Sequence, residues 1–196
     1  KTTLHRRARM QTQKKDSKTI NFETDQQVMD RIATRFDILH DMTKAVIAGD
    51  VRAMIVTGPP GVGKSYGVEK ELDKASMMDS IAGRPIKYEV VKGAMTALGL
   101  YATLYKHADA NHVLVFDDCD SVLMDELSLN ILKAALDSGK KRVLHWNADS
   151  NKLRSEGIPD KFEFKGGVIF ITNVKFENVR SRKLQDHLEA LQSRCH

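Results

Sequence analysis

The feature that most constrains this chain is a glycine-rich segment at residues 58–65, GPPGVGKS, which follows a short apolar run and precedes a stretch with helical periodicity. The pattern G-x-x-x-x-G-K-[ST] between a strand and a helix is typical of a phosphate-binding loop. Glycines at positions 61 and 63 allow the backbone to point its N–H groups toward phosphate oxygens. We therefore expect a parallel α/β sheet with this loop at the carboxyl end of a strand.

Each polar residue of this loop has an expected role. Lys64 supplies a positive charge for the β- and γ-phosphates of ATP, Ser65 supplies a hydroxyl for Mg²⁺, and the following helix adds a favourable dipole. A glycine-rich turn that merely matches the pattern is the alternative, and the flanking strand and helix argue against it. The residues expected to bind the nucleotide are Gly58, Pro59, Pro60, Gly61, Val62, Gly63, Lys64, Ser65 and Tyr66.

A second motif, VLVFDD at residues 113–118, is an apolar strand that ends in two carboxylates. Acidic side chains at the carboxyl edge of a parallel sheet can hold the water shell of Mg²⁺. Asp117 is expected on the metal side with Ser65, and Asp118 is expected to be the general base that polarises the attacking water. Two aspartates after a strand more often cap a helix or lie in a solvated turn, but the loop upstream favours the catalytic interpretation.

Hydrophobic patterning predicts the rest of an α/β domain. Thr24 and Gln27 form a plausible capping box for a first helix that ends at Gly49. Four short segments are continuously apolar or rich in Val and Ile, and they alternate with helical stretches. This predicts a three-layer αβα architecture with a parallel sheet and right-handed crossovers. The expected strands are residues 53–57, 87–91, 113–116 and 168–172, and the expected helices are residues 25–47, 64–78, 95–107 and 121–137.

The region between Gly139 and Gly167 breaks this alternation. It contains two strand-like pieces, residues 142–146 and 161–164, which are separated by a long polar connector. We expect a β-hairpin inserted before the last strand of the core.

Together these motifs resemble the AAA+ ATPase family. The resemblance is carried by GPPGVGKS, by VLVFDDCD, by VIFITN ending in Asn173 and by LQSRC containing Arg194, and it covers residues 25–196. It implies a P-loop NTPase core that hydrolyses ATP to ADP and phosphate with Mg²⁺. It also implies that Asn173 is the sensor-1 residue, on a strand between the two nucleotide motifs, and that Arg194 is an arginine finger for a neighbouring subunit of a ring. A turn-forming asparagine and a surface cation are the alternatives for these two residues.

The chain departs from the family pattern in two places. The family usually has Glu at the position of Asp118, and the shorter side chain bears on the rate of hydrolysis more than on nucleotide binding. The chain ends at His196, where the family continues into a fifth strand and a small helical lid with a sensor-2 arginine, so we expect the lid to be absent from this chain. A nucleotide-gated binding module that hydrolyses ATP weakly is therefore an alternative function.

The distribution of charge bears on what such a motor acts on. The net charge is +5, yet residues 1–18 hold seven Lys or Arg and one Asp, so the rest of the chain is close to neutral. Residues 1–19 are expected to form a flexible basic arm, and residues 20–196 a single ATPase domain. The arm could contact phosphates or remain solvated.

Three further cations are candidate nucleic-acid contacts. Lys92 follows the second strand, where AAA+ rings present a substrate-gripping residue, and Lys152 and Arg154 lie in the hairpin connector. Protein unfoldases of the family typically have an aromatic residue in place of Lys92. We therefore expect an oligomeric motor or loader that acts on nucleic acid, in replication or a related DNA transaction and of phage or plasmid type. A protein-remodelling chaperone is the alternative, and solvated surface charges are the plain interpretation of the three residues.

Composition excludes several other classes. Hydrophobic residues make up 41% and charged residues 29% of the chain, as in globular proteins. No apolar run exceeds four residues, whereas a membrane-spanning helix needs about 20. Cys119 and Cys195 are too few for a disulfide scaffold or a zinc site, and the start KTTLHRR has no apolar signal segment, so we expect a cytoplasmic protein, in the host cytoplasm if phage-encoded.

Overall fold

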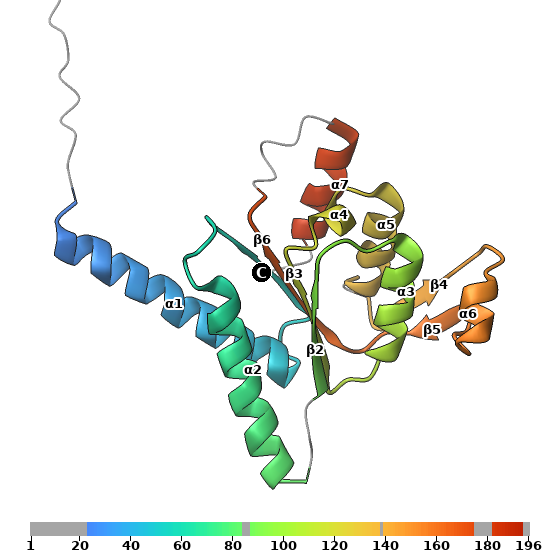
Figure 1. Cartoon of the computed structure of the whole chain (residues 1–196), viewed down its shortest axis with the longest axis horizontal. Coiled ribbons are helices and arrows are strands. Elements are labelled where there is room, and N and C mark those ends of the chain that lie inside the picture. Colours follow the sequence, from blue (N-terminus) through green and yellow to red (C-terminus); the bar gives the residue numbers. More distant parts are fainter. Residues whose placement is uncertain (1–22, 84–86, 138, 175–181, 194–196) are drawn as a thin grey trace, which may run out of the picture.

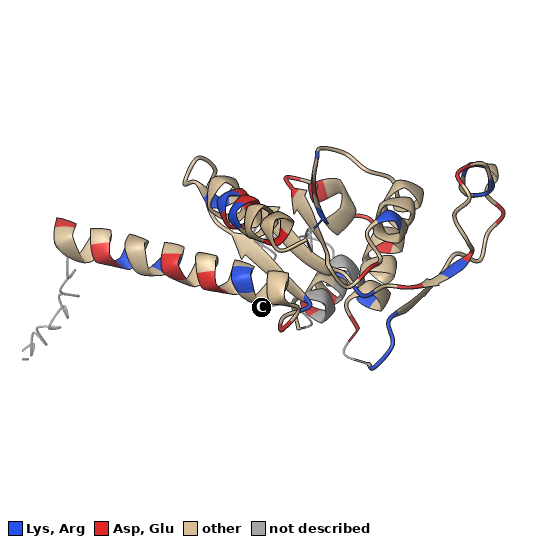
Figure 2. Ribbon diagram, turned by 90° about the horizontal axis from the view of Figure 1, so that it is seen from below, with Lys and Arg blue, Asp and Glu red and all other residues tan. Residues whose placement is uncertain are grey.

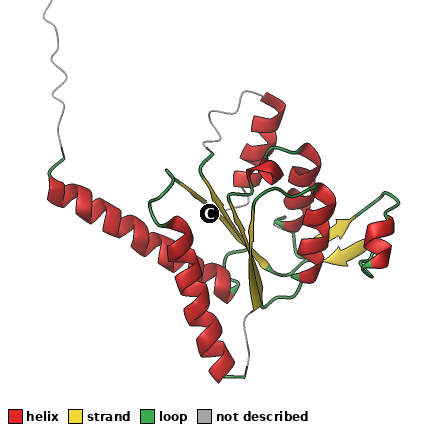
Figure 3. Cartoon of the chain, viewed as in Figure 1, coloured by secondary structure: helices red, strands yellow, loops and turns green. Residues whose placement is uncertain are grey.

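The computed structural model describes residues 23–83, 87–137, 139–174 and 182–193, which form a mixed α/β fold (Figures 1 and 3). Its helices are α1 Asp25–Ala48, α2 Lys64–Ile81, α3 Ala97–Lys106, α4 Asp120–Leu123, α5 Glu126–Ala135, α6 Asn151–Ser155 and α7 Arg182–Gln192. Its strands are β1 Ala53–Thr57, β2 Lys87–Lys92, β3 His112–Asp117, β4 Val143–His145, β5 Lys161–Glu163 and β6 Gly167–Thr172. The predicted basic arm, residues 1–19, lies outside the described residues.

Four strands form one parallel sheet in the order β1-β6-β3-β2. These are the four strands predicted from the apolar runs, and each lies within one residue of its expected bounds at either end. The last strand in the sequence, β6, lies between β1 and β3, as the sequence analysis expected. In this register Thr57 is the neighbour of Thr172, and Ile171 is the neighbour of Asp117. The order therefore places the end of β6 between the glycine-rich loop and the two aspartates.

Helices cover both faces of this sheet, which confirms the predicted three layers (Figure 1). On one face, Val113 and Val115 pack with residues of α1 and α2. On the other face, Leu114 and Phe116 pack with residues of α3 and α5, and the Phe116 ring stacks on Phe170 at a centroid distance of 5.2 Å. Successive residues of β3 point to opposite faces of the sheet. Because both faces are covered by helices, the residues on both faces must be apolar, as the continuous apolar run predicted. Each such side chain contributes about 1.5–3 kcal/mol when fully buried.

Local hydrogen bonds set the helix ends. The predicted capping box is present at α1, where Gln27 N donates to Thr24 Oγ1 and Thr24 N donates to the Gln27 side chain. Gly49 ends the helix in a left-handed conformation with φ 81°. The single helix predicted over residues 121–137 is wrong, because the segment divides into α4 and α5. Asp125 causes the break, since its carboxylate accepts from Ser128 N at 2.8 Å and so starts a new helix as its N-cap.

The predicted hairpin is confirmed. Strands β4 and β5 pair antiparallel, with Leu144 opposite Phe162, and the hairpin projects from the side of the domain farthest from α1 (Figure 1). Its connector contains a short helix, α6, that the sequence analysis did not predict. The buried Arg142 fixes the base of the hairpin by donating to the carbonyls of Ala135 and Gly166 at 3.2 and 3.1 Å. Burial lowers the pKa of Arg142 to about 10.

His112 gives the fold a pH dependence. Burial and the neighbouring His107, whose ring centroid is 5.4 Å away, lower the pKa of His112. The folded chain thus disfavours the protonated ring, and the stability that the neutral ring contributes is complete above the usual histidine pKa of about 6.5 and is lost as the pH falls below it. We expect a lower Tm at pH 5 than at pH 7.5, and a smaller difference in His112→Gln. Equal differences in the two proteins, measured by circular dichroism, would contradict this.

No helix among the described residues is both long enough and apolar enough to cross a lipid bilayer.

Candidate functional site

The glycine-rich loop connects β1 to α2 and is exposed over residues 59–63. Gly61 and Gly63 have φ values of 77° and 87°, in the left-handed region that favours glycine. Gly63 is also the N-cap of α2 and has no side chain to satisfy the first N–H groups of the helix. These N–H groups can therefore bind an anion, as expected of a phosphate-binding loop. Val62 and Tyr66, the larger predicted contacts, are 45% and 71% exposed.

Lys64 is the first residue of α2, and its side chain links the loop to the end of β6. Its ammonium donates to the carbonyls of Gly58 and Pro59 at 2.9 and 2.8 Å. It also donates to Asn173 Oδ1 at 2.9 Å. The structure therefore brings together two predicted site residues, Lys64 and Asn173, that are 109 positions apart in the sequence.

Asn173 in turn contacts the second aspartate. Its Nδ2 donates to Asp118 Oδ1 at 3.0 Å, so one amide bridges the ammonium of Lys64 and the carboxylate of Asp118. Among the described residues other than glycine, Asp118 alone has a positive φ, 54°. Aspartate tolerates this region better than most residues, and Asp118 N donates to Ile171 O at 2.9 Å, which holds the turn in place. The exposed carboxylate therefore lies at the same sheet edge as the loop.

Ser65 and Asp117, the two expected Mg²⁺ residues, are also in contact. Ser65 Oγ donates to Asp117 Oδ1 at 2.9 Å, and Asp117 is only 5% exposed. A hydroxyl and a carboxylate are the hard oxygen ligands that Mg²⁺ prefers, and this ion usually completes its shell with phosphate oxygens and water. The described residues contain no group of three or more His, Cys, Asp or Glu that could hold a metal ion. The pair fits an ion delivered with a nucleotide.

A hydrogen bond that the sequence analysis missed ties the two strand ends together. Thr172 Oγ1 donates to Asp120 Oδ1 at 2.6 Å, and Val174 N donates back to Thr172 Oγ1 at 3.0 Å. Thr172 precedes Asn173, and Asp120 follows the paired aspartates, so this contact ties the end of β6 to the segment after β3. Two observations together indicate this hydrogen bond: β3 pairs in parallel with β6, and the Thr172 hydroxyl is buried beside Asn173.

The three candidate nucleic-acid residues are not brought together. Lys92 lies at the predicted metal site, where its ammonium is 3.1 Å from Asp117 Oδ2 and 3.3 Å from Glu69 Oε1. The hydrogen bond to Asp117, and to a smaller extent the one to Glu69, raises the pKa of Lys92. Lys152 and Arg154 lie on α6 of the hairpin instead, and Arg154 pairs with Asp149 at 3.0 Å. The predicted arginine finger, Arg194, lies outside the described residues.

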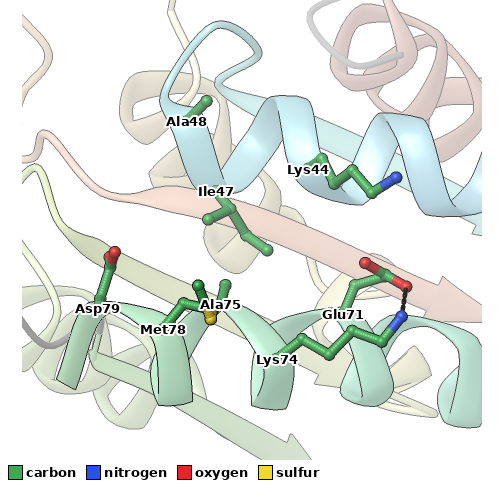
Figure 4. Close-up of a pocket in the computed structure, with 8 residues that line it drawn as sticks. All are labelled: Lys44, Ile47, Ala48, Glu71, Lys74, Ala75, Met78 and Asp79. Carbon is green, nitrogen blue, oxygen red and sulfur yellow. Dashed lines mark hydrogen bonds and ion pairs between the residues drawn. The ribbon is translucent and has the colours of Figure 1, made fainter. Parts of the chain in front are cut away.

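A separate groove runs between the end of α1 and the C-terminal half of α2 (Figure 4). In it Lys74 pairs with the buried carboxylate of Glu71 at 2.9 Å, and this hydrogen bond lowers the pKa of Glu71. None of the predicted site residues lines this groove. Its lining consists of Lys44, Ile47, Ala48, Glu71, Lys74, Ala75, Met78 and Asp79.

Comparison with known proteins gives one informative relative. No family model matches the chain. The chain is 40% identical over 166 residues to an uncharacterized 36.7 kDa protein from the nrdC-mobD intergenic region of Enterobacteria phage T4. The aligned segment is 84% of this chain and 49% of the phage protein, so the chain spans about half the length of the curated relative it matches. The relationship connects this sequence to a phage protein.

Proposed function

We propose that this chain is a magnesium-dependent ATPase with an AAA+ core. The observation that carries the proposal is the hydrogen-bonded series from Lys64 through Asn173 to Asp118, beside the Ser65–Asp117 pair. A cation, an amide, a carboxylate and a metal-ligand pair are the parts that phosphoryl transfer to water requires. The strand order β1-β6-β3-β2, with Asn173 after the strand between the two nucleotide motifs, supports the same proposal.

In the proposed reaction, N–H groups of the loop bind the phosphates of ATP, and Lys64 exchanges its carbonyl contacts for the β- and γ-phosphate oxygens. Asp118 accepts a proton from a water molecule whose oxygen attacks the γ-phosphorus. The bond from that phosphorus to the bridging oxygen breaks, and ADP and phosphate leave. Asn173 orients the water and Asp118 through its amide. Mg²⁺, when bound near Ser65 and Asp117, neutralises phosphate charge.

The experiment that tests hydrolysis is phosphate release from ATP, measured with Mg²⁺ and with excess EDTA. We expect continuous release with Mg²⁺ and none with EDTA. Saturable nucleotide binding without release above the buffer rate would instead identify the alternative, a nucleotide-gated binding module. Asp118 favours a slow reaction because its carboxylate is one methylene shorter than the glutamate usual at this position.

We further propose that nucleic acid is the substrate of the motor. Figure 2 shows Lys and Arg along the hairpin and the loop that precedes it. Four of these lysines are exposed: Lys140, Lys141, Lys152 and Lys161. The phage relative makes the host cytoplasm the proposed location. A ring in which Arg194 reaches a neighbouring active site is part of this proposal, and a protein-remodelling role is the second candidate.

Salt dependence of DNA binding tests the substrate. If the hairpin lysines contact phosphates, Lys152→Ala combined with Lys161→Ala should reduce the log–log salt slope for single-stranded DNA by about 1.4, since each contact contributes about 0.7. The matched control, Lys44→Ala with Lys87→Ala, should leave the slope unchanged.

The ATPase rate should rise with single-stranded or duplex DNA. Stimulation by unfolded protein alone, with no DNA effect, would favour the remodelling role.

A further inference from the structure

The carboxylate of Asp117 has two partners of different kinds. Its Oδ1 accepts from the Ser65 hydroxyl at 2.9 Å, and its Oδ2 lies 3.1 Å from the Lys92 ammonium. The Asp117 side chain is 6% exposed, whereas that of Lys92 is 60% exposed. A buried carboxylate at the predicted metal site therefore already has a cation on its second oxygen.

Rigid elements bring these groups together. Lys92 and Asp117 are paired neighbours on the parallel strands β2 and β3. Glu69 lies on α2, one helical turn after Ser65, and its Oε1 is 3.3 Å from the Lys92 ammonium. Gly93, with φ 90°, turns the chain immediately after Lys92. The ammonium at the end of β2 thus contacts one carboxylate on the neighbouring strand and another on α2.

We propose that Lys92 is a positioning residue that competes with Mg²⁺ for the carboxylate of Asp117. The inference rests on the proposed function, because the ion in question arrives with ATP. An ammonium and a hydrated divalent cation on one carboxylate repel each other, and removal of the ammonium strengthens metal binding. When ATP binds together with Mg²⁺, the ion pair between Lys92 and Asp117 therefore weakens. The ion pair between Lys92 and Glu69 remains.

This competition predicts that substitutions of Lys92 and of Glu69 change the Mg²⁺ requirement in opposite directions. Lys92→Met removes the competing charge, so the Mg²⁺ concentration that gives half-maximal nucleotide binding should fall about 5- to 10-fold. This factor is at the low end of the range for coupled binding sites, because the ammonium is exposed to solvent. Glu69→Gln removes the carboxylate that draws Lys92 away from Asp117. The Mg²⁺ requirement should therefore rise in that variant.

The experiment measures binding of a fluorescent ATP analogue to the chain at a series of Mg²⁺ concentrations and at 0.15 M salt, so the readout is affinity and not turnover. Lys87→Met is the matched control, since it removes the same charge from the opposite end of β2. Five residues along a strand span about 16 Å, which is roughly twice the Debye length of about 8 Å. The control should leave the Mg²⁺ requirement unchanged within about twofold.

The outcomes separate this inference from the function on which it rests. A lower Mg²⁺ requirement in Lys92→Met and a higher one in Glu69→Gln support the competition. An unchanged requirement in both variants, or an equal shift in Lys87→Met, overturns it while leaving nucleotide binding intact. If the wild-type chain binds no nucleotide at any Mg²⁺ concentration, both the inference and the proposed function are wrong. Thermal melts establish that each variant is folded.

Discussion

Replacing Lys64 with alanine is expected to weaken ATP binding about 100-fold or more, because hydrogen bonds to charged groups contribute about 1.5–3 kcal/mol each. The Lys64 ammonium lies between Gly58 O, Pro59 O and Asn173 Oδ1. Its loss leaves the phosphates with the backbone N–H donors, the helix dipole and Mg²⁺. Isothermal titration calorimetry with ATP and Mg²⁺ gives the affinity of both proteins.

The matched control for this prediction is Lys44→Ala, which removes an exposed lysine from α1 that pairs with Asp41. We expect its ATP affinity to equal that of the wild type. The Lys64 side chain is only partly buried and belongs to neither apolar core cluster, so Lys64→Ala should keep the wild-type Tm to within a few degrees. Unchanged affinity in a folded Lys64→Ala protein would show that the loop does not bind the phosphates.

Replacing Asp118 with asparagine is expected to reduce kcat for ATP hydrolysis by about 10²–10⁴, the range that general-base catalysis contributes. Asparagine tolerates the left-handed backbone at this position, where φ is 54°, and its side-chain oxygen can still accept from Asn173 Nδ2. The fold and the ATP affinity should therefore stay close to wild type. What is lost is the charge that accepts a proton from water.

Phosphate-release kinetics at saturating ATP measure this effect. Asp149→Asn serves as the control because Asp149 is an exposed aspartate in the hairpin connector, outside the proposed site. Its kcat should match the wild type. If Asp118→Asn retains kcat within about twofold, Asp118 is not the base, since that difference is far below the effect of general-base catalysis.

Local sequence signals were sufficient for most of the fold. Strands β3 and β6 are buried on both faces, so each is a nearly continuous apolar run that a single sequence reveals. Strand β2 lies at the edge of the sheet and none of its residues is fully buried, so its signal was the valines at positions 90 and 91. The loop was predictable because the left-handed backbone at Gly61 and Gly63 requires glycine, and Thr24 with Gln27 marked the start of α1 for a similarly local reason.

The remaining differences involve contacts that depend on tertiary structure or on competing local signals. The break between α4 and α5 arises because Asp125 caps a helix inside a run whose apolar periodicity is otherwise continuous. The short α6 depends on burial of Leu153 against the core cluster, which sequence alone does not show. Lys92 was expected to face a substrate, and only the pairing of β2 with β3 reveals its contact with Asp117.

The central claim is that residues 58–65 form a nucleotide site, and the most direct test is calorimetric titration of the wild-type chain with ATP in excess Mg²⁺. We expect saturable binding at one site per chain, with a Kd between about 1 µM and 1 mM, the range usual for substrates of such enzymes. We also expect ADP to compete for the same site. Absence of saturable heat at millimolar ATP, with a folded chain and Mg²⁺ present, would show that residues 58–65 are not a nucleotide site.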